Sequence, residues 1–436
     1  MRERGSVFVV TLAILTALVA IVASVAATEQ VALKEQGYRS DMIQARLMAN
    51  AGIQRAVEVL SDESASGNTT TTQGSGSSGS NANLPGATTL QDDWATLGTT
   101  GNDRFVLKNG SFRLQILDAA SRVNLNTATA QQLQALPLLQ EQIDALTDWR
   151  TAGETAKPDG AKDAYYNGLQ NPYDASLTNF STVSELLDVR YFTPADLYDP
   201  PVNQPLGGVT LQDFADGRTA TLGEILTVDS NSPAVTQQGS NKTALSGASL
   251  QTLTRAGYGP IAQTLFNARR DTTWAQIIRS VPGITTGQLR NLLNNYYVGT
   301  STQAGKINVN TASATVLQTI PGITQDEAQT IVNQQSTGYT SLGSVLTIPG
   351  LTTVRSVTNT IDQLAVNSNV FIVRVIGKVG NAVVPLEAVL SVTVAPSGQN
   401  ETVKILRIED QPFNDMTGRW GWQTDTNNDV DLEAGS

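Results

Sequence analysis

Carboxylates and amides carry the chemistry that this sequence offers, because its 436 residues include neither histidine nor cysteine. Histidine is the usual general base and metal ligand, and cysteine the usual thiol nucleophile. Ser-His-Asp and Cys-His catalysis are therefore excluded. The sequence contains no phosphate-binding loop or dinucleotide-binding motif. Catalysis would therefore need two distant carboxylates that the fold brings together, as in a glycosidase. We do not expect an enzyme.

An acidic run near the C-terminus has a spacing that would suit calcium. Its oxygen-bearing side chains stand at alternate positions: Asp425, Asn427, Asp429 and Asp431. Calcium prefers oxygen ligands of this kind. The run lacks the glycine that forms the sharp turn of an EF-hand loop. A solvated acidic loop is therefore the interpretation that we favour over a calcium site.

An uncharged segment at the N-terminus predicts the main positioning element. Residues 6–28 carry no charge, Arg2 and Arg4 precede them, and Glu29 follows them. About 20 apolar residues span a hydrocarbon core, and basic residues stay on the cytoplasmic side. The segment therefore predicts a membrane helix with the rest of the chain outside.

Three interpretations of this segment compete. It is a plain anchor, a secretory signal cut near Ser24–Ala26, or a type IV pilin-like leader cut between Gly5 and Ser6. A secretory signal would have a shorter apolar core, of about 7–15 residues. The order Arg4, Gly5 and then an apolar helix favours the pilin-like leader.

The pattern after Glu29 remains helical but becomes amphipathic, which strengthens the pilin-like interpretation. Apolar residues recur near helical spacing, with polar residues at many other positions. The apolar positions are Met42, Leu47, Ala49, Ile53, Val57 and Leu60. No proline interrupts residues 6–60. One helix is therefore expected to run from the membrane into a folded domain.

The remaining chain predicts strands on both sides of a helical block. Residues 61–103 include a Gly, Ser and Thr-rich stretch of low complexity, which we expect to be a loop. Residues 104–117 and 369–408 have strand patterns, and Asn109-Gly110 and Gly380-Asn381 are turn signals. In residues 112–116 the alternation predicts one buried and one solvated sheet face. The predicted order is a leader (1–5), a helix (6–60), a loop (61–103), the first sheet part (104–122), an inserted helical domain (123–355), and the second sheet part with a tail (356–436).

An internal repeat lies inside the helical block. Residues 123–137 match residues 307–321 closely, and both copies end at a proline. Asn126-Thr127 and Asn310-Thr311 are the predicted helix starts. In the second copy Gly322 follows the proline, which predicts a helix-hairpin-helix unit. The first copy lacks this glycine, so its turn must differ. A shorter Thr- or Ser-capped unit recurs at Thr182, Thr221, Thr273 and Ser341.

The chain as a whole resembles the GspK-type minor pseudopilins of type II secretion. The resemblance rests on motifs in order after the pilin-like leader: residues 118–126, 146–150, 159–166, 171–173, 184–187, 307–312 and 371–375. It implies an α+β fold, with a long pilin-like N-terminal helix on an antiparallel sheet. It also implies a large inserted all-α domain containing helix-hairpin-helix-like repeats.

The resemblance further implies a place in a secretion machine. A prepilin peptidase would cut after Gly5, and the new N-terminus at Ser6 would be methylated. The protein would lie in the bacterial inner membrane with its C-terminal domain in the periplasm. Its partners would be other minor pseudopilins, the major pseudopilin and the inner-membrane secretion platform, at a pseudopilus tip that it initiates or caps. Val10 stands at the fifth mature position, where most pilin-like helices carry Glu.

Two further properties follow from resemblances. GspK-type proteins can bind calcium, and the matching loop here contains Asp159 and Asp163, with Lys162 where an acidic residue would be expected. The 307–312 motif also resembles membrane-anchored DNA receptors of natural transformation. The second hairpin contains Asp326 and Glu327 but no basic residue, and the net charge is −11, so we expect no nucleic acid partner. A DNA receptor or a minor pilin of a type IV pilus is the alternative function.

Overall fold

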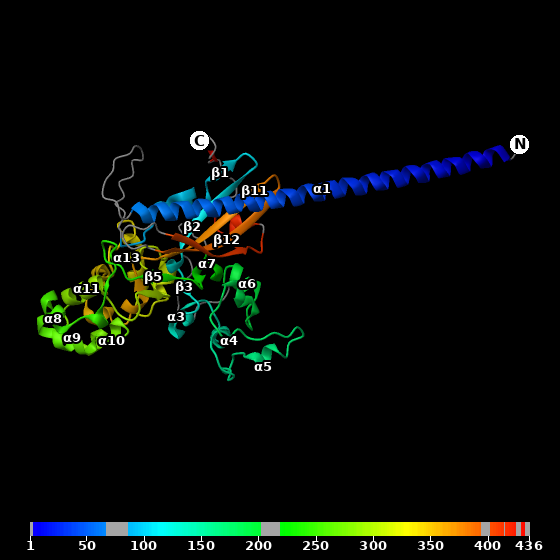
Figure 1. Ribbon diagram of the computed structural model, residues 1–436. Coiled ribbons are helices and arrows are strands. Elements are labelled where there is room, and N and C mark those ends of the chain that lie inside the picture. Colours follow the sequence, from blue (N-terminus) through cyan, green and yellow to red (C-terminus); the bar gives the residue numbers. More distant parts are fainter. Residues whose placement is uncertain are drawn as a thin grey trace.

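The long helix α1 (Glu3–Ser66) is the dominant feature of the computed structural model. The model describes residues 3–66, 86–201, 219–393, 402–413, 415–423 and 429–431. In Figure 1 the first half of α1 projects away from the molecule and its second half lies along a sheet. The prediction of one helix running from the apolar segment into the folded part is confirmed.

Six strands form the sheet on which α1 lies, in the order β13-β12-β11-β2-β1-β14. Their bounds are β1 (Arg104–Leu107), β2 (Gly110–Asp118), β11 (Val370–Val379), β12 (Ala382–Thr393), β13 (Thr402–Asp410) and β14 (Asp429–Asp431). Neighbouring strands are antiparallel, except that β1 and β14 are parallel. The strands therefore come from both ends of the chain, as the sequence predicts.

One stripe of α1 packs against this sheet. Its buried residues are Ala45, Ala49, Ile53, Ala56 and Leu60, at steps of three or four residues. On the sheet, alternate residues of each strand point to the helix because side chains of a strand alternate between faces. They include Phe112, Leu114 and Ile116 of β2 and Phe371, Val373 and Val375 of β11. Leu47 does not belong to the stripe, contrary to prediction; it is 56% exposed.

Two glycines bring the helix and the sheet into close contact. A Cβ added to Gly52 of α1 would lie 2.6 Å from Val375 Cγ1. A Cβ added to Gly377 of β11 would lie 2.5 Å from the backbone nitrogen of Ala49 and would overlap the carbonyl oxygen of Ala45. Side-chain atoms have no room here, which explains why both positions are glycine.

At β2 the other face of the sheet is covered rather than solvated, so the prediction for residues 112–116 is wrong. Arg113 is buried, and its guanidinium donates to the carbonyl oxygens of Gly101 (2.6 Å) and Gln423 (2.8 Å). It also lies 5.2 Å from the centre of the Trp422 ring. The covering segment follows α15 (Met416–Arg419), far from β2 in sequence. Alternation within one strand carries no information about such a distant segment.

The predicted loop at 61–103 is partly folded. From Gly86 onwards the chain is described, and it forms α2 (Asp93–Thr96) and the 3₁₀ helix η1 (Leu97–Gly101). Trp94 is buried, with its ring centre 5.2 Å from that of Phe371. The low-complexity residues 67–85 lie outside the described residues.

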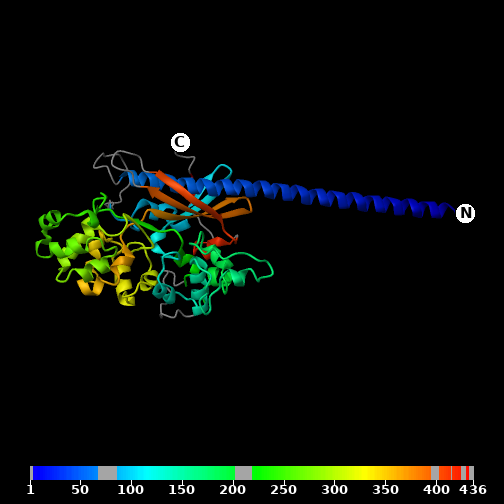
Figure 2. The same ribbon diagram turned by 60° about the horizontal axis from the view of Figure 1, so that its bottom comes forward.

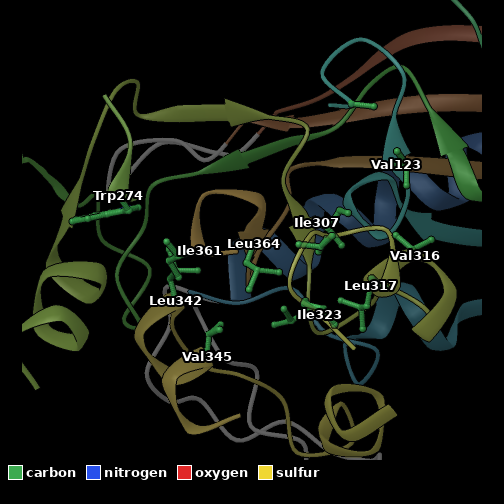
Figure 3. Packing of buried hydrophobic residues seen from close by; sticks show 14 of the residues in the cluster. Val123, Trp274, Ile307, Val316, Leu317, Ile323, Leu342, Val345, Ile361 and Leu364 are labelled. Atoms are coloured by element: carbon green, nitrogen blue, oxygen red, sulfur yellow. The ribbon is translucent and has the colours of Figure 1, made fainter. Parts of the chain in front are cut away.

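The helical block is inserted between two neighbouring strands, β2 and β11. The chain leaves the sheet at Asp118 and re-enters it at Val370, while these strands pair with each other. The largest apolar core contains residues from Val123 to Val366, so the helical core continues beyond residue 355. Figure 3 shows part of this core, with Leu342 and Val345 close to Ile361 and Leu364.

The elements of the block are short. Its helices are α3 (Ala130–Ala135), α4 (Gln140–Arg150), α5 (Asp163–Tyr166), α6 (Pro194–Tyr198), α7 (Leu222–Ile225), α8 (Leu250–Leu253), α9 (Ala262–Ala268), α10 (Trp274–Ser280), α11 (Thr286–Asn295), α12 (Ala314–Gln318), α13 (Gln325–Gln334) and α14 (Val354–Val357). Single turns are η2 (Ala119–Ser121), η3 (Ser184–Asp188), η4 (Leu245–Gly247), η5 (Thr254–Tyr258), η6 (Gly259–Ile261), η7 (Leu342–Thr347) and η8 (Ile361–Gln363). Short strand pairs are β3 (Val123–Asn124) with β4 (Leu226–Thr227), β5 (Asn231–Pro233) with β8 (Thr302–Ala304), β6 (Thr243–Ala244) with β7 (Tyr296–Tyr297), and β9 (Ile307–Asn308) with β10 (Leu364–Ala365).

Polar side chains start many of these helices. The predicted units at Thr221, Thr273 and Ser341 have capping boxes, and Thr182 Oγ1 accepts from the backbone nitrogen of Glu185 (3.1 Å). The predicted starts of the repeat helices are wrong. Thr129 and Ser313 cap α3 and α12, instead of Asn126-Thr127 and Asn310-Thr311.

Substitution of Gly377 by Ala tests the close contact. We expect the full-length protein in detergent to lose about 1–3 kcal/mol of unfolding free energy, because backbone atoms of α1 must move away from the new methyl group. Urea unfolding followed by circular dichroism measures the loss. Gly247→Ala is the matched control, because nothing lies within 4 Å of the Cβ added there. An unchanged midpoint for Gly377→Ala would contradict the contact.

Candidate assembly site

The first half of α1 presents an apolar surface that the chain itself does not cover. All described side chains from Phe8 to Ser40 are exposed, including Phe8 at 68% and Val19 at 62%. The helix is long and apolar enough to span a membrane, with a mean hydropathy of 2.7 in its most apolar window. At 1.5 Å per residue, the uncharged residues 6–28 cover about 35 Å, enough for a hydrocarbon core of about 30 Å. The segment fits a single-pass anchor.

The predicted processing residues lie at the start of this helix. Gly5 and Ser6 are in the first turns of α1. Val10, one turn further on, is 53% exposed. No charged side chain lies between Arg4 and Glu29, so an apolar environment can cover the side chains of this segment without burying a charged one.

Two asparagines bind together the strand and loop segments of the first repeat copy. The Nδ2 of Asn126 donates to the carbonyl oxygens of Phe180 (3.0 Å) and Val228 (3.2 Å). Its Oδ1 accepts from the backbone nitrogen of Phe180 (2.7 Å). Asn124 Oδ1 accepts from the backbone nitrogen of Asn126 (2.9 Å). These amides replace backbone pairing where the strands are only two residues long.

The second copy repeats this arrangement. The Nδ2 of Asn310 donates to the carbonyl oxygens of Tyr339 and Val366, both at 3.0 Å. Its Oδ1 accepts from the backbone nitrogen of Tyr339 (2.6 Å), and Asn308 Oδ1 accepts from that of Asn310 (3.0 Å). The repeated Asn-x-Asn motif therefore holds together two similar lobes. The described parts of residues 123–228 form the first lobe, and residues 307–366 form the second. The sequence signal for this role is the repetition of both asparagines in the two copies; Asn126 and Asn310 bridge loops and do not start helices, contrary to prediction.

A buried carboxylate joins the second lobe to the sheet. Asp118, at the end of β2, accepts from Asn308 Nδ2 (2.8 Å) and Thr311 Oγ1 (2.6 Å) through Oδ2. Its Oδ1 accepts from the backbone nitrogen of Ala120 (2.7 Å). Burial raises the pKa of Asp118, and these donors oppose that rise. Each donor points at one carboxylate, so the network determines the angle between the lobe and the sheet.

The hairpins of the block differ between the copies. In the second, Gly322 has φ 91° and the backbone nitrogen of Ile323 donates to the carbonyl oxygen of Ile320. In the first, the backbone nitrogen of Leu138 donates to the carbonyl oxygen of Leu136, a tighter turn. The prediction of a different turn in the first copy is confirmed.

An acidic side chain lies against one hairpin. Glu327 Oε2 accepts from the backbone nitrogen of Thr324 (2.8 Å). Its Oε1 lies so close to Gly350 that a Cβ added to this glycine would overlap it. A phosphate held by the backbone of the 348–351 hairpin would meet this carboxylate. The arrangement disfavours binding of nucleic acid at this point.

The loop around Asp159 and Asp163 is organised by a lysine. Lys162 is buried, and its Nζ donates to the carbonyl oxygens of Asp148 (2.6 Å) and Thr151. Asp163 Oδ1 accepts from the backbone nitrogen of Ala175 (2.8 Å), while Asp159 is exposed. The ammonium group uses carbonyl oxygens that a calcium ion would need, so this loop does not fit calcium.

The C-terminal acidic run is only partly described. Asp425 and Asn427 lie outside the described residues, as does the side chain of Asp431. Asp429 is paired with Arg104 through two hydrogen bonds of 2.7 and 2.6 Å, and this pairing lowers the pKa of Asp429. Among the described residues, no three acidic side chains come together as a metal site. Calcium binding at this run stays a prediction.

Comparison with known proteins places two segments in one family. Family models of protein K of the type II secretion system match residues 113–199 and 307–367. The first begins in β2 and covers most of the first lobe, and the second covers the second lobe. A chain of the crystal structure of the GspK-GspI-GspJ complex from the enterotoxigenic Escherichia coli type 2 secretion system has 14% sequence identity and a TM-score of 0.46. The match covers 88% of this chain and 99% of that one. The comparison with curated proteins gives no match.

The role of Lys162 predicts how calcium and a substitution affect stability. We expect calcium at about 1 mM to leave the melting temperature unchanged, because Lys162 already supplies the positive charge. Lys162→Met should cost about 1–3 kcal/mol, because two carbonyl oxygens lose their donor. Differential scanning calorimetry measures both effects, with Lys404→Met, an exposed lysine of β13, as the control. A calcium-induced rise that persists in Lys162→Met would instead point to the C-terminal run.

Proposed function

We propose that this chain occupies the tip of a pseudopilus. It belongs to the protein K family of the type II secretion system and is a GspK-type minor pseudopilin. It would assemble there with two other minor pseudopilins, above the major pseudopilin, and initiate or cap the fibre. Proteins of this family are structural components of secretion. The observation that carries the proposal is the uncovered apolar half of α1 in a chain with two protein K segments.

The apolar half of α1 has two successive environments in this proposal. In the inner membrane, lipid covers it, with the folded part in the periplasm. In the pseudopilus, the helices of neighbouring subunits cover it. Each fully buried Val, Leu, Ile or Phe side chain contributes about 1.5–3 kcal/mol, so either environment stabilises the exposed helix strongly. Without one of these environments the segment would cause aggregation.

The position of the helical block supports the tip. Figures 1 and 2 show that the block extends beyond the C-terminal end of α1, away from the N-terminus. Helices α8 and α9 lie at its far end (Figure 1). In a fibre of parallel N-terminal helices, a subunit above this one would lie on this side. The block occupies that space, so a subunit of this shape ends the fibre.

The alternative of a DNA receptor has less support. Glu327 lies against the hairpin at Gly350, and the chain carries a net charge of −11. Phosphate binding depends on positive charge near the backbone. A minor pilin of a type IV pilus would share α1 but not the two protein K segments.

N-terminal processing provides the first test. In membranes that contain a prepilin peptidase, we expect a mature chain that begins at Ser6 with a methylated amine. Intact mass measurement and N-terminal sequencing detect both changes. A start near Thr28 would show an ordinary secretory signal, and an intact Met1 would show a plain anchor. Both results would contradict the pilin-like mechanism.

Cross-linking tests the tip position directly. The chain has no native cysteine, so each introduced cysteine is its only thiol. We expect Val10→Cys to cross-link to cysteines in the helices of other pseudopilins. Leu250→Cys, in α8, should cross-link to none of them. Labelling of Leu250→Cys with a soluble maleimide is the control, since Leu250 is 37% exposed. Cross-linking of Leu250→Cys to the major pseudopilin would place a subunit above this one and contradict the tip.

A further inference from the structure

A polar cleft lies in the helical block. It is small, about 40 Å³, and opens to solvent. Its walls come from the strand pairs β5–β8 and β6–β7, from the start of α10, and from the segment that follows η8. Its lining includes Ser232, Lys242, Trp274, Tyr296, Gln303 and Lys306. Trp274 is labelled in Figure 3, together with Leu342 and Leu364, which also line the cleft.

Two ammonium groups line this Lys242–Lys306 cleft, and no carboxylate does. Lys242 Nζ donates to the carbonyl oxygen of Leu293 (2.8 Å), which leaves two of its three protons for other acceptors. Lys306 Nζ has no hydrogen-bond acceptor and no ion-pair partner within the described residues. Burial lowers the pKa of both lysines to about 8, and Lys306 adds to the effect on Lys242.

The nearest acidic group does not neutralise Lys306. Asp362 has an electrostatic effect on Lys306 but forms no ion pair with it. Its oxygens instead accept from the backbone nitrogens of Trp274 (2.7 Å) and Ala275 (2.9 Å) at the start of α10. The polar side chains of Ser232 and Gln303 are also used within the fold, because they donate to Asn367 Oδ1 (2.6 Å) and to the carbonyl oxygen of Val298 (2.8 Å). The two ammonium groups are therefore the cationic donors that line the cleft, beside the hydroxyl groups of Tyr296 and Tyr297.

The buried walls of the cleft strengthen the attraction between its lysines and an anion, compared with an open surface. Trp274 and Tyr296 are 2% and 8% exposed, so the walls are largely closed to water. Electrostatic attraction is stronger where water is excluded, and a cation left unpaired in such a place is costly. Binding of an anion would remove this cost.

The charge of the chain selects among anions. With a net charge of −11, the protein repels polyanions such as nucleic acid and anionic membranes. A protein segment with one carboxylate carries little charge of its own, so it meets little of this repulsion. We propose that the Lys242–Lys306 cleft binds a carboxylate group presented by a partner protein. This inference does not depend on the tip position of the chain.

The test uses the full-length protein in detergent with a blocked Gly-Glu-Gly peptide, which carries one carboxylate, as the probe. Isothermal titration calorimetry measures binding, with the blocked Gly-Gln-Gly peptide and inorganic phosphate as comparison ligands. We expect the glutamate peptide to bind. We also expect Lys306→Met to weaken binding about tenfold or more. Lys404→Met changes the net charge equally at an exposed site and should bind like the wild type.

The melting temperature without peptide separates a binding lysine from a structural one. Lys306→Met should not lower it, because the substitution removes a half-buried charge that has no partner. A lower melting temperature together with unchanged peptide binding would overturn the proposal. Absence of peptide binding by the wild type, or equal binding of the glutamine peptide, would also overturn it. Binding of phosphate but not of the glutamate peptide would identify a site for small anions instead.

Discussion

The close contact between the second half of α1 and the sheet is the constraint on which the other features depend. A stripe of Ala45, Ala49, Gly52 and Ala56 faces a sheet that contains Gly377, so backbone lies almost against backbone. Larger residues would separate the two layers and open space in the core. The tight contact orients the helix, and because α1 is continuous, it also orients the apolar half. The folded part therefore has a defined position relative to whatever surrounds the first half, lipid or other helices.

The same sheet holds the helical block in place. Strands β2 and β11 are neighbours, yet the whole block lies between them in sequence, so both ends of the insertion leave from one site. Hinge motion is restricted when two adjacent strands carry the connections. The buried Asp118 also orients the block relative to the sheet, because it accepts hydrogen bonds from Asn308 and Thr311 of the second lobe. A buried carboxylate without a cation contributes little net stability, but its hydrogen bonds are satisfied in only one arrangement.

The sequence predicted the parts whose signals are local. Apolar residues near helical spacing predicted α1, and strand-forming runs beside turn signals predicted β2 and β11. Strands at both ends predicted an inserted block. Interactions between distant segments were missed. Nothing in residues 112–116 shows that Trp422 covers their second face, and nothing near Trp94 shows that it packs on Phe371. The prediction of helix starts at Asn126 and Asn310 is wrong, because an asparagine that caps a helix and one that bridges two loops look alike in sequence.

The duplicated motif explains how one block can combine rigidity with variation. In both copies a short parallel strand pair and a bridging asparagine hold the lobe together through main-chain atoms, so the contacts do not depend on neighbouring side chains. The loops between these fixed points are then free to differ. The first lobe places Lys162 among carbonyl oxygens, where its charge is satisfied internally. Near the second lobe, Lys306 faces a cleft with no internal partner in the described residues. The buried Lys162 and the half-buried Lys306 thus have opposite consequences on one repeated framework: the first completes a loop, and the second leaves a positive charge for a ligand.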